Sequence, residues 1–320
     1  MFAGFAQFKT DFNTACLYIY RVMNIRTGFI PLGIEKQLYY EDIGDQKLPA
    51  LFFIHGGPGL GCEEKHRTQF NLSKYRVILF DQRGCNRSQP AGDISENTTQ
   101  LLVQDIETLR KRLRIEKIIL LGSSWGAVLA LQYAAHFTER VEKIILKSPF
   151  WAQENDFLWS YTHRGAAQKL PQAWKDFSTC CSLEGGWPLI NYYSEKILSD
   201  SPDLEALARW VNWEGALYFA ERPSEQSNLS ASGLNSFWIN ATKIQIHYLK
   251  NNFFLDDNSL KVAVQKIREK QIPAFCLQGD KDRVTPLEHL KEIQKLWPEL
   301  AVKIVHGADH KIPEEELKLL

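Results

Sequence analysis

The chain has 320 residues, which is enough for one large α/β domain or for two smaller domains. Apolar residues make up 44% of it and charged residues 24%, and its 38 Lys and Arg equal its 38 Asp and Glu. This balance lacks the strong positive field that recruits nucleic acid or an anionic membrane, so neither is expected as a partner.

The N-terminus and the cysteines predict a cytoplasmic protein. Lys9 and Asp11 interrupt the first apolar stretch, which argues against a secretory signal, and no later stretch is long and apolar enough to span a bilayer. The cysteines are scattered and form no C-x-x-C pair, a pattern typical of reduced thiols rather than of a disulfide or zinc framework. They are Cys16, Cys62, Cys85, Cys180, Cys181 and Cys276.

Two early antiparallel strands are expected between residues 16 and 41, and a buried strand at 50–54 follows. That strand leads directly into the loop 55–59, with the sequence HGGPG. Three glycines and a proline prevent regular structure there and leave backbone N–H groups accessible, as a developing oxyanion requires. The alternative is an ordinary Gly/Pro loop.

The next buried strand, 76–80, ends in a charged loop that contains Asp81, Arg83 and Arg87. Charge at the end of a buried strand costs free energy unless it is paired. We therefore expect these three side chains to pair locally and to hold neighbouring loops in place. Helically spaced apolar residues then predict a helix from residue 98, with residue 97 or 98 as its cap.

A strand-to-helix turn follows at 122–126, with the sequence GSSWG. The apolar run 118–121 is typical of a buried strand, and residues 127–135 are rich in helix formers. A sharp turn between them needs small residues two before and two after its centre, and the two glycines meet that need. Ser124 is then expected to stand exposed at the carboxyl edge of a sheet, above a helix N-terminus. The alternative is a Gly/Ser turn without chemistry.

The alternation of strands and helices, continued by a strand at 141–146, predicts a parallel sheet covered by helices. The pattern changes after residue 148, since no buried β run is visible to about residue 257 and many aromatic residues fall on helical patterns. It resumes with strands at 274–278 and 301–305 and a helix between them. We therefore predict a core of residues 1–148 and 258–320 and a helical cap of residues 149–257.

The two resumed strands end in aspartate and histidine residues. An activated serine needs an imidazole and a carboxylate that orients it, and the order Ser, Asp, His on successive strand ends brings the three together. Asp280 and Asp282 compete for the acid, and Asp282 is preferred because it lies deeper in its loop. His310 follows the flexible Gly307 and is preferred as the base over His306, which is a candidate core residue. The alternative hypothesis is a zinc site at His306 and His310, but the sequence has no H-E-x-x-H motif there.

Four motifs together resemble those of the prolyl iminopeptidase family of α/β-hydrolases, which removes N-terminal proline from peptides. They are HGGPG at 55–59, DQRG at 81–84 continuing to Ser88, GSSWG at 122–126 and GADH at 307–310. The resemblance runs from about residue 30 to the C-terminus and continues through the insertion. It implies an α/β-hydrolase fold, with a mostly parallel central sheet, helices on both faces and a helical cap, and it implies no metal and no cofactor.

The resemblance also implies roles for single residues. Ser124 is the expected nucleophile, Asp282 the acid of the triad and His310 the base. Gly57 and Trp125 are expected to donate backbone N–H groups to the oxyanion.

The cap segment 209–215 resembles the family segment whose glutamate, here Glu214, binds the free amine of the substrate. A carboxylate at this position is also expected on physical grounds, because a cationic amine in a desolvated pocket needs a carboxylate partner. Read from its residue type alone, Glu214 is a solvated charge on a helix.

Four positions depart from the family pattern, and one of them is Asn86, which replaces a glycine in the loop that begins at Asp81. Gln245 stands where the family has a second amine-binding glutamate, and Leu249 and Ser160 stand where aromatic residues of the proline pocket are expected. Phe150 and Tyr161 remain as expected pocket residues.

We therefore predict a serine hydrolase that releases N-terminal proline, or another small residue, from peptides through an acyl-enzyme. The alternative is a carboxylesterase or lactonase with the same triad, so the partner is a peptide or a small amide or ester. A third hypothesis is a binding protein on a hydrolase scaffold. Haloalkane dehalogenase and epoxide hydrolase are excluded because they need aspartate where this chain has Ser124.

Overall fold

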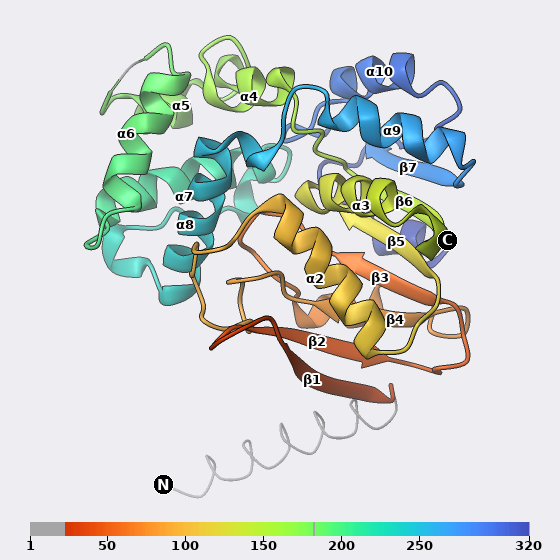
Figure 1. The fold of residues 1–320 in the computed structure, drawn as a ribbon. Coiled ribbons are helices and arrows are strands. Elements are labelled where there is room, and N and C mark those ends of the chain that lie inside the picture. The colour runs from red at the N-terminus through yellow and green to blue at the C-terminus, as the bar shows by residue number, and fades with distance from the viewer. Residues whose placement is uncertain (1–22, 182, 320) are drawn as a thin grey trace, which may run out of the picture.

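The computed structural model describes residues 23–181 and 183–319. Within them, eight strands form one sheet in the order β1-β2-β4-β3-β5-β6-β7-β8 (Figure 1). β2 is antiparallel to both of its neighbours, and all other neighbouring strands are parallel. The strands are β1 Ile25–Pro31, β2 Gln37–Ile43, β3 Ala50–Ile54, β4 Arg76–Phe80, β5 Ile118–Ser123, β6 Val141–Lys147, β7 Ala274–Gly279 and β8 Ala301–Val305.

Four helices cover one face of the sheet: α2 Thr99–Arg112, α3 Trp125–His136, α9 Ser259–Glu269 and α10 Leu287–Leu296. The opposite face packs against Phe70 and the short C-terminal helix α11, Glu314–Lys318. All five residues of β3 and of β4 are buried, which explains why these strands read as continuous apolar runs. The predicted α/β fold is confirmed, whereas α9 was not predicted.

Five helices of the segment between β6 and α9 lie to one side of the sheet (Figure 1). They are α4 Glu154–Tyr161, α5 Pro171–Ser178, α6 Trp187–Ile197, α7 Leu204–Tyr218 and α8 Ser236–Lys250. Aromatic rings form their core, since Phe177 stacks on Tyr193 and on Trp213 with centroid distances of 4.8 and 5.4 Å. The division into a core and a cap at residues 148 and 257 stays a prediction.

Short 3-10 helices complete the described elements: η1 Glu64–Thr68, η2 Thr138–Arg140, η3 Ala166–Gln168, η4 Pro223–Glu225, η5 Ala231–Gly233 and η6 Asn252–Phe254. No helix in the described ranges is both long enough and apolar enough to cross a membrane. All the described cysteines are free thiols. Cys16, the predicted start of the first strand and the N-terminal stretch with Lys9 and Asp11 lie outside the described residues.

The charged loop after β4 pairs more widely than the sequence predicted. Asp81 does bind Arg87, with 2.7 Å between Oδ2 and Nε. Arg83 instead binds Asp105 of α2 at 2.6 Å, because its side chain extends toward that helix. The loop is therefore held by α2 as well as by its own charges.

The N-cap residue of α2 is Thr98, whose side chain accepts a hydrogen bond from the N–H of Leu101. Asn97 is buried and donates its side-chain amide to the carbonyl oxygen of Arg83. Asn97 therefore anchors the charged loop rather than the helix.

Candidate active site

The turn between β5 and α3 has the strained geometry expected of an exposed nucleophile. Ser124 has φ 53° and ψ −121°, a left-handed conformation that is rare for a residue with a side chain. A Cβ on Gly122 would collide with the carbonyl of Gly126, and one on Gly126 would collide with the carbonyl of Ile54. Both glycines are therefore required for α3 to approach the sheet this closely.

The HGGPG loop lies directly against this serine. A Cβ placed on Gly56 would lie only 3.1 Å from the Cβ of Ser124. Gly57 has φ +122°, which a residue with a side chain rarely adopts. Trp125 is the first residue of α3, and the first N–H groups of a helix have no partner within that helix. Gly57 directly follows Gly56, and Trp125 directly follows Ser124, so each predicted oxyanion donor is one residue away from this contact.

A buried network that the sequence analysis missed holds the loop in place. His55 accepts the backbone N–H of Gln82 at Nε2, 3.0 Å away, and burial lowers its pKa, so the ring is neutral. The side-chain amide of Gln82 donates to the carbonyl of His55 at 2.8 Å and accepts the indole N–H of Trp125 at 3.1 Å. Gln82 therefore joins the loops after β3, β4 and β5.

Asp282 and His310 form a buried hydrogen-bonded pair. The distance from Nδ1 of His310 to Oδ2 of Asp282 is 2.8 Å, and both residues are more than 90% buried. Gln278 and Thr285 also donate side-chain hydrogen bonds to Oδ2, while the backbone N–H groups of Val284 and Thr285 donate to Oδ1. These donors fix the carboxylate in position toward the imidazole.

The competing residues Asp280 and His306 are placed elsewhere. Nδ1 of His306 lies 3.0 Å from Oδ2 of Asp280, and the His306 side chain is 86% exposed. The alternative that His306 is a core residue is therefore wrong. Nor is His306 arranged as a partner of His310, since each histidine binds a different aspartate. In the described part of the chain, no group of three or more metal-ligand side chains is clustered.

Lys147, the last residue of β6, and Ser148, directly after it, connect the serine to the histidine. The carbonyl oxygen of Lys147 accepts the N–H of Ser124 at 3.0 Å, and the hydroxyl of Ser148 donates to the carbonyl of His310 at 3.1 Å. β6 lies between β5 and β7 in the sheet, so it bridges the strand ends that carry Ser124 and Asp282. The predicted nucleophile, acid and base are thus gathered at one edge.

Glu214 lies in α7 and is bound by two other predicted pocket residues. The hydroxyl of Tyr161 donates to Oε1 of Glu214 at 2.9 Å. Burial raises the pKa of Glu214, and hydrogen bonds from Tyr161 and Gln245 and the charge of His310 oppose that rise. Glu214 is therefore a desolvated carboxylate within electrostatic reach of the triad histidine, and its reading as a solvated helix charge is wrong.

The orientation of the Gln245 amide follows from its neighbour Trp210. The indole N–H of Trp210, which is only a donor, lies 2.9 Å from Oε1 of Gln245. The amide nitrogen of Gln245 is thereby directed to Glu214, to which it donates. Tyr161 also stacks on Trp210, with 5.4 Å between ring centroids. Trp210 thus orients both partners of Glu214, a role that sequence reasoning missed.

Phe150 adjoins the nucleophile through its backbone. Its N–H donates to the carbonyl of Ser124 at 3.2 Å, and its ring packs on Phe253 at 5.0 Å. Leu249 and Ser160, which stand where aromatic pocket residues are expected, are both buried.

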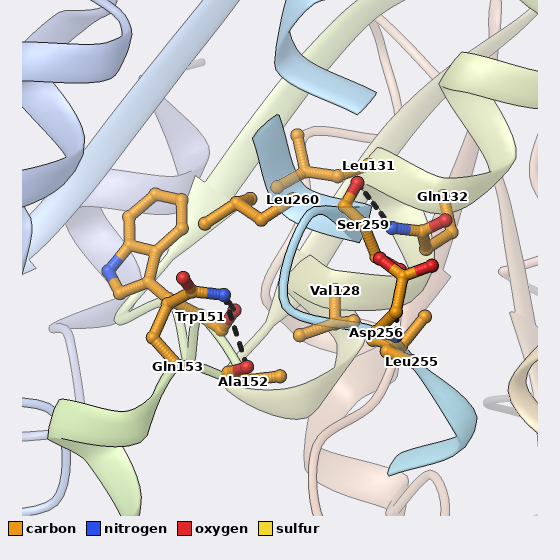
Figure 2. A pocket seen from close by; sticks show the side chains of 10 residues that line it. All are labelled: Val128, Leu131, Gln132, Trp151, Ala152, Gln153, Leu255, Asp256, Ser259 and Leu260. Atoms are coloured by element: carbon orange, nitrogen blue, oxygen red, sulfur yellow. Dashed lines mark hydrogen bonds between the residues drawn. The ribbon is translucent and has the colours of Figure 1, made fainter. Parts of the chain in front are cut away.

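The pocket of Figure 2 is separate from this site. It lies between α3 and the start of α9, where Val128 and Leu131 face Leu260. None of the predicted site residues lines it.

Two further residues beside the triad were missed by the sequence analysis. Thr285 binds Asp282 through both its hydroxyl and its N–H, and this local turn is detectable from the Asp-x-x-Thr spacing. Tyr218 of α7 packs its ring at 5.8 Å from that of His310. The Tyr218 contact joins residues 92 positions apart and has no local sequence signal.

Comparison with known proteins identifies the family. The α/β-hydrolase fold family matches residues 49–317. Proline iminopeptidase of Xylella fastidiosa is 33% identical over 295 residues, covering 90% of this chain and 92% of the relative, and that of Arabidopsis thaliana is 35% identical over 292 residues, covering 90% and 76%. The chain belongs to the proline iminopeptidase family. The predicted resemblance is confirmed, and the chain is a hydrolase similar to prolyl aminopeptidases.

Solved structures of low sequence identity share the fold. A bromoperoxidase from Bacillus anthracis superposes with a TM-score of 0.62 at 20% identity, covering 89% of this chain and 93% of that chain. A proline iminopeptidase-related protein from Thermus thermophilus gives 0.54 at 24% identity, covering 89% and 90%. These likenesses support the α/β-hydrolase fold, on which different chemistries occur.

Proposed function

We propose that the chain releases N-terminal proline, or another small N-terminal residue, from peptides by means of a triad of Ser124, His310 and Asp282. The observation that carries this proposal is the desolvated carboxylate of Glu214 beside His310. A carboxylate in such a site favours a substrate with a cationic amine next to the scissile bond. The family membership supports the same reaction, since curated relatives are proline iminopeptidases.

In the proposed mechanism, Oγ of Ser124 attacks the acyl carbonyl carbon while Nε2 of His310 takes the hydroxyl proton. The Asp282 carboxylate, hydrogen-bonded to Nδ1, stabilises the imidazolium. Backbone N–H groups of Gly57 and Trp125 stabilise the oxyanion of the tetrahedral intermediate. His310 then protonates the leaving amine as the C–N bond breaks, and water releases the acyl group from Ser124 by the same steps.

The cap residues explain why such an enzyme acts at chain ends. Burial and the neighbouring Glu214 carboxylate raise the pKa of Tyr161 well above its ordinary value, so its hydroxyl stays a donor. The fixed carboxylate then binds the substrate ammonium, and Phe150 lies beside the nucleophile as a wall for the acyl group. An internal peptide bond offers no ammonium at that place, so it gains no such ion pair.

The test is steady-state hydrolysis of proline p-nitroanilide beside its N-acetylated twin, with p-nitrophenyl acetate as a measure of triad competence. A strong preference for the free amine supports the aminopeptidase. Turnover of the acetate ester with neither proline compound cleaved contradicts it.

The second candidate is a carboxylesterase or lactonase, and Gln245 is the observation that favours it. Its amide brings no charge, and it already donates to Glu214, so the substrate ammonium has one carboxylate to bind. An esterase treats esters with and without a free α-amine alike. In the aminopeptidase, Gln245→Glu adds a second carboxylate and strengthens the preference for the free amine.

The proposal also retains a cytoplasmic location, the absence of nucleic-acid and membrane partners, and catalysis without a metal or cofactor. It also retains a cap of residues 149–257 on a core of residues 1–148 and 258–320.

A further inference from the structure

Two adjacent residues after α7, Glu221 and Arg222, bind the two loops that carry the triad acid and base. Oε1 of Glu221 accepts from Nε of Arg283 at 2.9 Å, and Arg283 directly follows Asp282. Nε of Arg222 donates to Oδ2 of Asp309 at 2.6 Å, and Asp309 directly precedes His310. One dipeptide of the insertion therefore holds both loops of the core.

Arg222 is held firmly in its own surroundings. Its guanidinium also binds Glu225 and lies against the rings of Tyr218 and Phe219, at 5.6 and 5.2 Å from their centroids. Its partner Asp309 is only 7% exposed and accepts the backbone N–H of Lys311 at 2.9 Å. A buried charge pair with a planar guanidinium fixes direction as well as distance.

Helix α4 of the insertion also binds the loop that carries Asp282. The carbonyl oxygen of Arg283 accepts the indole N–H of Trp159, in α4, at 2.7 Å. Arg283 thus binds the insertion through both its side chain and its backbone.

Helix α7, which precedes Glu221 and Arg222, also carries Glu214, the proposed amine-binding carboxylate. Glu214 and Tyr218 are four residues apart in α7 and so share one helix face. Tyr218 contacts His310, and Glu221 and Arg222 follow within one more turn of chain. The amine site, the histidine contact and the two loop contacts therefore lie on one short stretch of chain, residues 214–222.

We propose that Glu221 and Arg222 are positioning residues that set the distance between the acid loop and the base loop of the triad. The inference rests on the proposed function, because it assumes that Asp282 and His310 act together. The Glu221–Arg283 pair is partly exposed and contributes little to stability. A displacement of a catalytic group by about 1 Å, in contrast, costs up to about 100-fold in rate. Loss of the Glu221–Arg283 contact therefore reduces turnover rather than folding.

The first test measures kcat and KM for p-nitrophenyl acetate and for proline p-nitroanilide in Glu221→Gln, Arg283→Gln and Arg222→Gln. We expect kcat to fall about tenfold with both substrates. We expect KM to stay within about twofold, because these residues do not touch the acyl group. The melting temperature is measured alongside. The matched control is Arg268→Gln, whose ion pair with Glu299 at 2.7 Å touches neither triad loop.

A charge swap separates positioning from a general structural effect. Glu221→Arg combined with Arg283→Glu rebuilds the pair with reversed charges, and we expect it to recover most of the kcat lost in either single variant. Unchanged kcat in the single variants, or no recovery in a folded double variant, overturns the inference. Ser124→Ala tests the proposed function separately. Activity retained in that variant overturns the proposed function, not the positioning role of Glu221 and Arg222.

Discussion

The Asp282 carboxylate uses nearly all of its hydrogen-bonding capacity within the site. Its two oxygens accept hydrogen bonds from the backbone of residues 284 and 285, from the side chains of Gln278 and Thr285, and from His310. A carboxylate has about four lone-pair directions, so little capacity is left for another partner. Nδ1 of His310 therefore carries its proton toward Asp282, and Nε2 is left to accept a proton from a serine.

The role of Ser124 is tested by replacing it with alanine. Because members of a triad act as a unit, we expect Ser124→Ala to lower kcat by about 10⁴-fold or more with every substrate. The measurement is p-nitrophenyl acetate hydrolysis together with labelling by a fluorophosphonate. Ser123→Ala, one residue earlier in the same turn, serves as the control and keeps near-normal turnover. Equal activity in both variants would remove Ser124 as the nucleophile.

The role of Glu214 is tested by comparing substrates with and without an amine. Charge-assisted hydrogen bonds contribute about 1.5–3 kcal/mol, so Glu214→Gln is expected to lower kcat/KM for proline p-nitroanilide about 10- to 100-fold. Hydrolysis of p-nitrophenyl acetate stays near normal. The control is Glu205→Gln, an exposed glutamate of the same helix. A similar loss with both substrates contradicts amine binding.

Glu214 also predicts a pH dependence. Burial raises its pKa, so it becomes neutral at a higher pH than an exposed glutamate and then no longer attracts an ammonium. We expect the ratio of kcat/KM for proline p-nitroanilide to that for p-nitrophenyl acetate to fall as the pH drops through this raised pKa. Any group on which the two reactions depend equally cancels in the ratio. A ratio that stays flat to the pH where ordinary glutamates titrate would be inconsistent with this role.

Among the elements, the β5–α3 unit depends most on close packing against its neighbours. The backbone of α3 passes so near β3 that only glycine fits at position 126. The same approach brings the HGGPG loop against Ser124, so packing and the proposed oxyanion site have one origin. A change that lifts α3 from the sheet is expected to disturb both.

Gly126→Ala tests this dependence. Its Cβ meets backbone atoms of residues 54 and 55 that cannot move aside, so we expect a loss of about 3 kcal/mol in the free energy of unfolding and little residual activity. Denaturant unfolding measures the first and ester hydrolysis the second. The control is Gly215→Ala within α7, where a Cβ makes only ordinary contact with Gln226 at 3.5 Å. Similar stability of the two variants would contradict the packing argument.

Across the molecule, the insertion and the sheet meet where the reaction is proposed. The sheet supplies the serine, the acid and the base, while α4, α7 and α8 supply Tyr161, Glu214 and Gln245. The insertion is joined to the core by the chain after β6 and before α9 and by several contacts, among them those of residues 159, 221 and 222.

Native-state hydrogen exchange tests the predicted division into core and cap. Amides of β3 and β5, two central strands whose residues are almost all buried, are expected to exchange only through global unfolding. Amides of α5 to α8 are expected to exchange through unfolding of the insertion alone. Their free energy of opening is then lower than that of the sheet, and it depends on denaturant concentration in the same way for all of them. One free energy shared by both regions would show a single cooperative unit instead.

The amino-acid sequence was sufficient for several features that depend on local chemistry. Buried runs predicted β3 and β4 at their observed bounds, because a strand buried on both faces is mostly apolar. β8 was also predicted at its observed bounds, although most of its residues are exposed or half-buried. The glycines around Ser124 predicted the strained turn, since steric limits on φ act within a few residues. Family motifs then added roles that spacing alone does not contain.

Only the tertiary structure decided which side chains meet over long separations in the chain. Asp282 rather than Asp280 reaches His310, Arg83 binds Asp105 rather than Asp81, and Thr98 caps its helix because Asn97 is drawn to the charged loop. The bonds from Trp210 to Gln245 and from Tyr161 to Glu214 join residues 35 and 53 positions apart. Such contacts depend on how whole helices pack, and that packing is a sum over many residues that no local pattern contains.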